Sequence, residues 1–218
     1  MIAMLLAAGR GERLRPITDR MPKPLVEVQG TSLIERHLAA LADAGATTVV
    51  INLGWLGEQI AERIGSGDRY GVQVLYSDER DNILETAGGI RRALPLLGRE
   101  PFLVVNADIY TDIPLPCDPP EASEVAHLVL VPTPAFKTKG DFDIEDGKLT
   151  NADEPRYTFS GVAMYRPEFF ADLEDGRRPL APLLKRAAAE GRIGASLYEG
   201  VWADVGTPER LEALNSNG

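Results

Sequence analysis

Residues 2–18 read IAMLLAAGRGERLRPIT, an apolar run followed by a loop that contains two glycines. An unbroken apolar segment that ends at glycine is typical of a strand buried on both faces of a parallel sheet, so we predict a strand over Ile2–Ala8. Gly9 and Gly11 allow the next residues to turn tightly and to direct N–H groups toward phosphate oxygens. The loop is neither a dinucleotide fingerprint nor a Walker A motif, because no third glycine and no Gly-Lys-Ser/Thr follow.

Strand and helix patterns alternate over the first half of the chain. The expected strands after the first are 47–53, 72–77 and 102–106, and the expected helices are 33–44, 55–64 and 86–97. The first of these helices starts with a capping box, Ser32 with Glu35 three residues later. This alternation predicts an α/β fold with a doubly wound parallel sheet, in which ligands bind at the carboxyl ends of the strands.

The pattern changes after residue 112. Four prolines between positions 113 and 120 indicate a loop, and Asp146-Gly147 is a hairpin signal. The remaining expected elements are strands at 125–131, 157–165 and 193–198, a helix at 179–190 and a terminal helix that begins at Thr207-Pro208. We therefore predict a mixed, mainly parallel central sheet with a small β lobe, all within one domain of residues 1–218.

Composition excludes several classes of function. The 218 residues carry 33 acidic and 23 basic side chains, a net charge of −10, which argues against a nucleic-acid or membrane-surface binder. One cysteine and two histidines leave no disulfide framework and little for a histidine-based metal site. The N-terminal apolar run is too short for a membrane span and lacks the features of a signal peptide, so we expect a cytoplasmic protein.

Basic residues are concentrated near the N-terminus. Residues 1–25 hold five basic and two acidic side chains, which indicates either an anion site or a solvated basic loop. Lys23 stands between Pro22 and Pro24, whose fixed φ angles hold its ammonium group in place. The alternative is a surface turn stiffened by proline, but the glycine loop beside it favours phosphate binding.

Two aspartates stand where a metal site would need them. Asp108 follows the expected strand 102–106, and Asp204 lies at the end of a second expected strand, so we expect the two carboxylates to converge at the top of one sheet. Mg²⁺ prefers oxygen ligands and keeps open positions for substrate phosphates. The alternative is that each aspartate caps a helix or turn. Together with the phosphate-binding loop, the pair favours a metal site.

These motifs resemble the sugar-1-phosphate nucleotidylyltransferases. The resemblance rests on the pattern Gly-x-Gly-x-Arg-x-x-Pro-x-Thr at residues 9–18, Pro-Lys-Pro at 22–24, Asn-Ala-Asp at 106–108 and Asp-Val-Gly-Thr at 204–207. It covers nearly the whole chain and implies a three-layer Rossmann-like nucleotidyltransferase fold. Residues 1–112 would mainly bind the nucleotide, and residues 113–218 would mainly bind the sugar.

The resemblance also implies roles for individual residues. The catalytic group would comprise Arg13, Lys23 and Asp108, and Asp108 with Asp204 would hold Mg²⁺. The residues expected around the nucleoside triphosphate are Gly11, Glu12, Arg13, Lys23, Glu85, Gly88 and Asn106. The residues expected around the sugar are Asp141, Asp153 and Gly161. The nucleophile is a sugar phosphate whose second pKa is about 6, so no catalytic base is required.

Within the family, the short length and residues 85–89, 140–142 and 159–161 most resemble the uridylyltransferases that act on N-acetylmuramic acid 1-phosphate in cell-wall recycling. The expected partners are thus UTP and a sugar 1-phosphate, bound by a monomer or weak homodimer. The alternatives are GTP with mannose 1-phosphate, dTTP or UTP with glucose 1-phosphate, and a non-catalytic nucleotide-sugar sensor. A sensor would be expected to lack Lys23, Asp108 or Asp204, and all three are present.

The sugar side departs from the family pattern. Members commonly carry Glu-Lys-Pro where this chain has Asp-Glu-Pro at 153–155, so Lys23 or Arg156 would have to neutralise more phosphate charge. N-acetylmuramic acid also carries a lactyl carboxylate. Lys137, Lys139 and Arg156 flank the expected sugar segments and are candidate partners for it, or all three are exposed solubilising residues.

Overall fold

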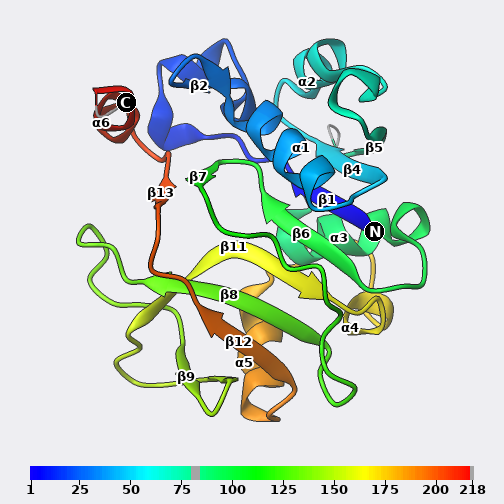
Figure 1. Cartoon of the computed structure of the whole chain (residues 1–218), viewed down its shortest axis with the longest axis vertical. Helices are drawn as coiled ribbons and strands as arrows, with labels where there is room; N and C mark the ends of the chain where they lie inside the picture. The colour runs from blue at the N-terminus through cyan, green and yellow to red at the C-terminus, as the bar shows by residue number, and fades with distance from the viewer. Residues whose placement is uncertain (80–83, 217–218) are drawn as a thin grey trace.

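The computed structural model describes residues 1–79 and 84–216, and its centre is a nine-stranded sheet (Figure 1). The strand order is β5-β4-β1-β6-β11-β8-β12-β10-β9. The bounds are β1 Ile2–Leu6, β4 Thr48–Leu53, β5 Gln73–Asp78, β6 Phe102–Asn106, β8 Ala126–Pro132, β9 Asp143–Glu145, β10 Lys148–Thr150, β11 Tyr157–Tyr165 and β12 Ile193–Leu197.

The direction of the strands changes once the chain passes β6. The strands β5, β4, β1 and β6 run parallel to one another, as the alternating pattern predicts. β11 is antiparallel to both β6 and β8, whereas β12 is parallel to β8. The predicted mixed sheet is confirmed. The strands expected in a small β lobe extend this same sheet past β6.

Helices cover both faces of the sheet and make the three predicted layers (Figure 1). One face carries α1 (Leu33–Asp43) and α2 (Gly57–Ile64), and the other carries α3 (Glu85–Leu97), α4 (Glu168–Ala171) and α5 (Ala181–Ala189). Alternate residues of a strand point to opposite faces, so Leu5 joins one apolar core and Met4 the other. This explains the continuous apolar run that opens the chain.

The capping box at α1 forms and extends into a larger cluster. The Ser32 hydroxyl lies 2.6 Å from Oε2 of Glu35 and accepts a hydrogen bond from the Glu35 N–H. Tyr70 and Arg63 also donate to the Glu35 carboxylate. Burial opposes ionisation of Glu35, but these hydrogen bonds outweigh it and lower its pKa to about 2.

Several short helices and two-stranded ribbons lie outside the central sheet. The loop after β1 contains three single-turn 3₁₀ helices, η1 (Glu12–Leu14), η2 (Ile17–Asp19) and η3 (Lys23–Leu25), and another, η4 (Asp68–Tyr70), precedes β5. Two small antiparallel ribbons pair β2 (Glu27–Val28) with β3 (Thr31–Ser32), and β7 (Ile109–Thr111) with β13 (Trp202–Asp204). The chain ends in α6 (Pro208–Ser216).

Among the helices in the described part of the chain, none has the length and apolar content needed to cross a membrane.

Candidate active site

The glycine loop after β1 folds back on itself. Gly11 has φ +63°, and a Cβ there would lie 2.9 Å from Cγ2 of Thr18 and 3.2 Å from Cβ of Lys23. The Thr18 hydroxyl donates to the Gly11 carbonyl at 2.8 Å. Only glycine fits this turn, both for its backbone angle and for the space available.

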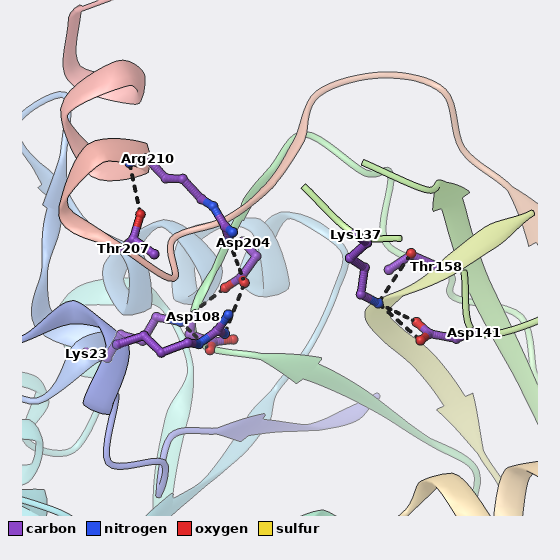
Figure 2. Close-up of polar contacts among 9 residues, drawn as sticks. Lys23, Asp108, Lys137, Asp141, Thr158, Asp204, Thr207 and Arg210 are labelled. Atoms are coloured by element: carbon purple, nitrogen blue, oxygen red, sulfur yellow. Dashed lines mark hydrogen bonds and ion pairs between the residues drawn. The ribbon is translucent and has the colours of Figure 1, made fainter. Parts of the chain in front are cut away.

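Lys23 is buried, with 6% of its surface exposed, and it bridges the two predicted metal ligands. Its Nζ lies 2.6 Å from Oδ2 of Asp108 and 3.2 Å from Oδ1 of Asp204 (Figure 2). The structure thus brings together three residues that are widely separated in the sequence.

Asp204 reaches this position by a route that the sequence did not indicate. We predicted that both aspartates lie at strand ends of one sheet, and this is wrong for Asp204. After Asp108 the chain forms β7, which pairs with β13 so that Asp204 lies opposite Ile109. The Val205 N–H also contacts the Asp108 carbonyl at 3.3 Å. A separate two-stranded ribbon therefore places Asp204 beside the end of β6.

Two arginines complete the cluster. Arg13 and Arg210 both approach Oδ2 of Asp204, with nitrogen–oxygen distances of 3.3 and 3.1 Å. Figure 2 shows Arg210 reaching Asp204 from α6. With Lys23, three cations face two carboxylates. This excess of positive charge favours the binding of phosphate oxygens, for which arginine and lysine are suited.

A first cavity of about 440 Å³ opens in front of this cluster. Its wall is formed by the glycine loop, including Gly11, Glu12 and Arg13, and by Lys23 and Asp108. The predicted phosphate-binding residues are therefore gathered around one space. Glu12 and Arg13 expose much of their side chains, so both can reach a ligand.

A buried polar pair, Asn52 and Glu79, also lines the first cavity, and sequence reasoning missed it. Asn52 accepts a hydrogen bond from the Ala7 N–H at 2.6 Å and donates to Oε1 of Glu79 at 2.8 Å. Burial raises the pKa of Glu79. The signal in the sequence was Asn52 itself, a polar residue among the apolar residues 49–53 of β4.

A second cavity of about 810 Å³ adjoins the first. Glu85, Thr86 and Asn106 line both cavities and mark the junction between them. Asn106 ends β6 and packs against Gly161, where a Cβ would lie 2.6 Å from the Asn106 amide nitrogen. Gly161 has φ +88° and sits at the irregularity of β11, so the glycine keeps the junction open for the Asn106 side chain.

The other predicted sugar residues are less uniform in placement. Asp141 lines the second cavity, where it accepts from Lys137 at 3.0 Å (Figure 2). It also accepts from the Phe159 N–H at 3.0 Å. Asp153 is exposed and does not line it. Gly88, expected near the base, lines neither cavity. It packs against the Gly176 carbonyl, which a Cβ would approach to 2.3 Å.

Glu85, the other residue expected near the base, adopts φ +58° at the start of α3 and pairs with Arg177 at 2.6 Å. The two histidines of the chain, His37 and His127, lie outside both cavities. His37 is buried and contacts the Ile109 carbonyl at 2.9 Å through Nε2. Burial lowers its pKa to about 4, which keeps the ring neutral at pH 7.

The carboxylate pair fits a divalent cation. The ammonium of Lys23 stands in for a cation between Asp108 and Asp204 and shows that one positive group can contact an oxygen of each. In the described residues no group of three or more His, Cys, Asp or Glu side chains gathers into a metal site. A metal ion held between Asp108 and Asp204 would be bound by their carboxylate oxygens, the type of ligand that Mg²⁺ prefers.

Comparison with known proteins identifies the family. Residues 2–123, more than half of the chain, match the model of the family described as nucleotidyl transferase. The chain therefore belongs to the nucleotidyl transferase family. This confirms the class that the sequence motifs indicate, and with it the prediction that the protein is an enzyme of that class.

Individual relatives narrow the comparison. The chain is 47% identical to an N-acetylmuramate alpha-1-phosphate uridylyltransferase of Neisseria meningitidis serogroup B, over 97% of this chain and 96% of the relative. It is 37% identical to the protein of the same description from Caulobacter vibrioides, over 95% and 93%. The crystal structure of HddC from Yersinia pseudotuberculosis complexed with GMP-PN matches with a TM-score of 0.79 at 19% identity, over 99% and 98%, which supports the fold.

Proposed function

We propose that the protein transfers UMP from UTP to N-acetylmuramic acid 1-phosphate and releases pyrophosphate, in the recycling of cell-wall sugars. The observation that carries this proposal is the pair of cavities that meet at Glu85, Thr86 and Asn106, with the cation cluster of Lys23, Arg13 and Arg210 beside the first. The similarity to two uridylyltransferases along almost their whole length supports this choice of substrates.

The reaction joins two anions. The oxygen of the sugar phosphate attacks the α-phosphorus of UTP, a P–O bond forms there, and the bond to pyrophosphate breaks. Because a phosphate monoester is largely ionised at neutral pH, the protein has no proton to remove from the nucleophile. Its task is to align the two substrates and to neutralise the charge that develops on the transferred group and on pyrophosphate.

The residues of the first cavity can perform this task. The backbone of the loop at Gly11, together with Glu12 and Arg13, would surround the triphosphate, and Lys23 would contact phosphate oxygens of both substrates. Asn106, at the junction, would lie near the ribose or the α-phosphate. Glu85 at the same junction would be near the base, and Asp141 would face the sugar in the second cavity. Gly161, predicted as a sugar residue, lines neither cavity and instead packs against Asn106.

Asp108 and Asp204 would hold Mg²⁺, which when bound supplies positive charge to the phosphate oxygens. The same carboxylates contact Lys23, so the lysine and the metal ion share one pair of acidic groups. We expect the protein to act in the cytoplasm, where nucleoside triphosphates are held, and to work as a monomer or weak homodimer.

One experiment tests the proposal against its alternatives. Pyrophosphate release is measured over UTP, GTP, dTTP and CTP, each combined with the 1-phosphates of N-acetylmuramic acid, N-acetylglucosamine, glucose and mannose. We expect the highest kcat/KM for UTP with N-acetylmuramic acid 1-phosphate. A preference for GTP with mannose 1-phosphate, or for dTTP or UTP with glucose 1-phosphate, would replace the substrate pair. Nucleotide-sugar binding without turnover would indicate a sensor.

A further inference from the structure

The second cavity has an unbalanced positive charge. Four charged side chains line it, namely Glu85, Lys139, Asp141 and Lys185. Both acids are already neutralised from outside the cavity. The Glu85 carboxylate lies 2.6 Å from Nε of Arg177, and the Asp141 carboxylate lies 3.0 Å from Nζ of Lys137.

The two lysines, in contrast, have no acidic partner in the described part of the chain. Lys139 and Lys185 are both exposed, so their ammonium groups are solvated and free to move onto a ligand. Two cations without an acidic partner in the described residues thus line one cavity of a chain whose net charge is −10. They favour a ligand with a negative group.

The structure distinguishes between Lys137, Lys139 and Arg156, the three candidate partners for the sugar carboxylate. Lys137 is paired with Asp141, and Arg156 is paired with Asp143 at 2.6 Å, so neither presents a free charge. Of the three candidates only Lys139 has no acidic partner in the described residues. Lys185 of α5, which lines the same cavity, has none either. The side chain of Asn151 donates to the Lys185 carbonyl at 2.8 Å, which fixes this part of α5 against the segment that follows β10.

The position of the two lysines indicates that they contact a substituent of the sugar and not its phosphate. The phosphate of a sugar 1-phosphate must reach the first cavity, and it would do so across the junction at Glu85, Thr86 and Asn106. Lys139 and Lys185 line the second cavity only. They therefore face the part of the sugar that lies away from the anomeric phosphate.

We propose that Lys139 and Lys185 form the binding site for a carboxylate carried by the acceptor sugar, and so set the specificity for an acidic sugar 1-phosphate. This inference rests on the proposed function, because it assumes that the second cavity holds the acceptor. A carboxylate accepts charge-assisted hydrogen bonds from both ammonium groups. Neutral sugars of the same size would leave the two lysines unpaired and would gain nothing from them.

The test uses the full-length variants Lys139→Gln, Lys185→Gln and the double variant. The matched control is Arg186→Gln, which removes one exposed charge from the next position of α5 without touching the cavity. The kcat/KM values are measured with UTP and either N-acetylmuramic acid 1-phosphate or N-acetylglucosamine 1-phosphate, which lacks the lactyl carboxylate.

We expect the double variant to lose at least about tenfold in kcat/KM for the muramic substrate, which corresponds to about 1.4 kcal/mol. Its kcat/KM for the N-acetylglucosamine substrate should change less than about twofold, and Arg186→Gln should behave like the wild type with both. An equal loss with both sugars would overturn the inference by assigning the lysines to the phosphate or the sugar ring, and no loss with either would overturn it outright. If the wild-type protein does not prefer the muramic substrate, the proposed function itself fails.

Discussion

Replacing Lys23 by methionine removes the cation that the structure places between Asp108 and Asp204. The Lys23 side chain is 7% exposed, whereas that of Asp108 is 38% exposed and Asp204 keeps its contacts with Arg13 and Arg210. A fully buried ion pair that loses one partner costs roughly 3–5 kcal/mol, so we expect a smaller destabilisation here, about 1–2 kcal/mol.

The effect on catalysis should be larger than the effect on stability. A charge-assisted hydrogen bond is worth roughly 1.5–3 kcal/mol in the ground state, and contacts to developing charge are worth more in the transition state. We therefore expect Lys23→Met to lower kcat/KM by at least about 100-fold, with most of the variant still folded. The assay is pyrophosphate release, measured alongside urea unfolding.

The chain provides a matched control for this experiment. Lys148 pairs with the buried carboxylate of Glu124 at 2.5 Å and lines neither of the two cavities of the site. Lys148→Met should lower the free energy of unfolding by a similar amount and leave kcat/KM within about twofold of the wild type. A loss below about threefold in Lys23→Met, or an equal loss in both variants, would refute a catalytic role for Lys23.

Three further outcomes follow from the site and its surroundings. Chelation should abolish activity and Mg²⁺ should restore it, and Asp108→Asn should lower kcat severely with little change in the circular dichroism spectrum; full activity in this variant would remove the metal role. His37 has a pKa of about 4 when folded and 6.5 when unfolded, so its protonation favours unfolding, and stability should fall by about 3 kcal/mol between pH 6.5 and 4, a slope that His37→Gln should flatten in urea titrations. Glu35 has a folded pKa of about 2 against 4.5, so the stability that it contributes is present above pH 4.5 and is lost toward pH 2, and Glu35→Gln should flatten only this lower range. Unchanged slopes in either variant would contradict the pKa assignments.

Local sequence patterns predict most of the elements in this fold. Continuous apolar runs predict β1 and β6. A central parallel strand is covered on both faces of the sheet, so its sequence is apolar throughout and does not alternate. The hairpin at Asp146-Gly147 forms because both residues adopt positive φ, 49° and 75°, as a two-residue turn requires. These features depend on neighbours a few positions away in the chain.

The missing parts of the site depend on contacts between distant segments. Arg210 lies on a short terminal helix with no local feature that separates it from other surface arginines, and only the β7–β13 ribbon brings its partner Asp204 to the end of β6. Lys185 is a charged residue on an amphipathic helix, so its sequence position predicts exposure to solvent, and the structure confirms that it is exposed. Its relation to the second cavity appears only when α5 is placed against the sheet.

The topology of the sheet explains why the two cavities meet where they do. β6 is the last of the parallel strands, and its neighbour β11 runs in the opposite direction. Ligands of doubly wound sheets bind beyond the carboxyl ends of the strands, at the point where the connectivity changes. We call the boundary between β6 and β11 the seam. There Asn106 ends β6 and Gly161 interrupts the regular pairing of β11, and the missing Cβ of Gly161 leaves space for the side chain of Asn106. In our proposal the nucleotide lies on the parallel side of the seam and the sugar on the other side, which places the attacking oxygen and the α-phosphorus at the junction between the two halves of the sheet.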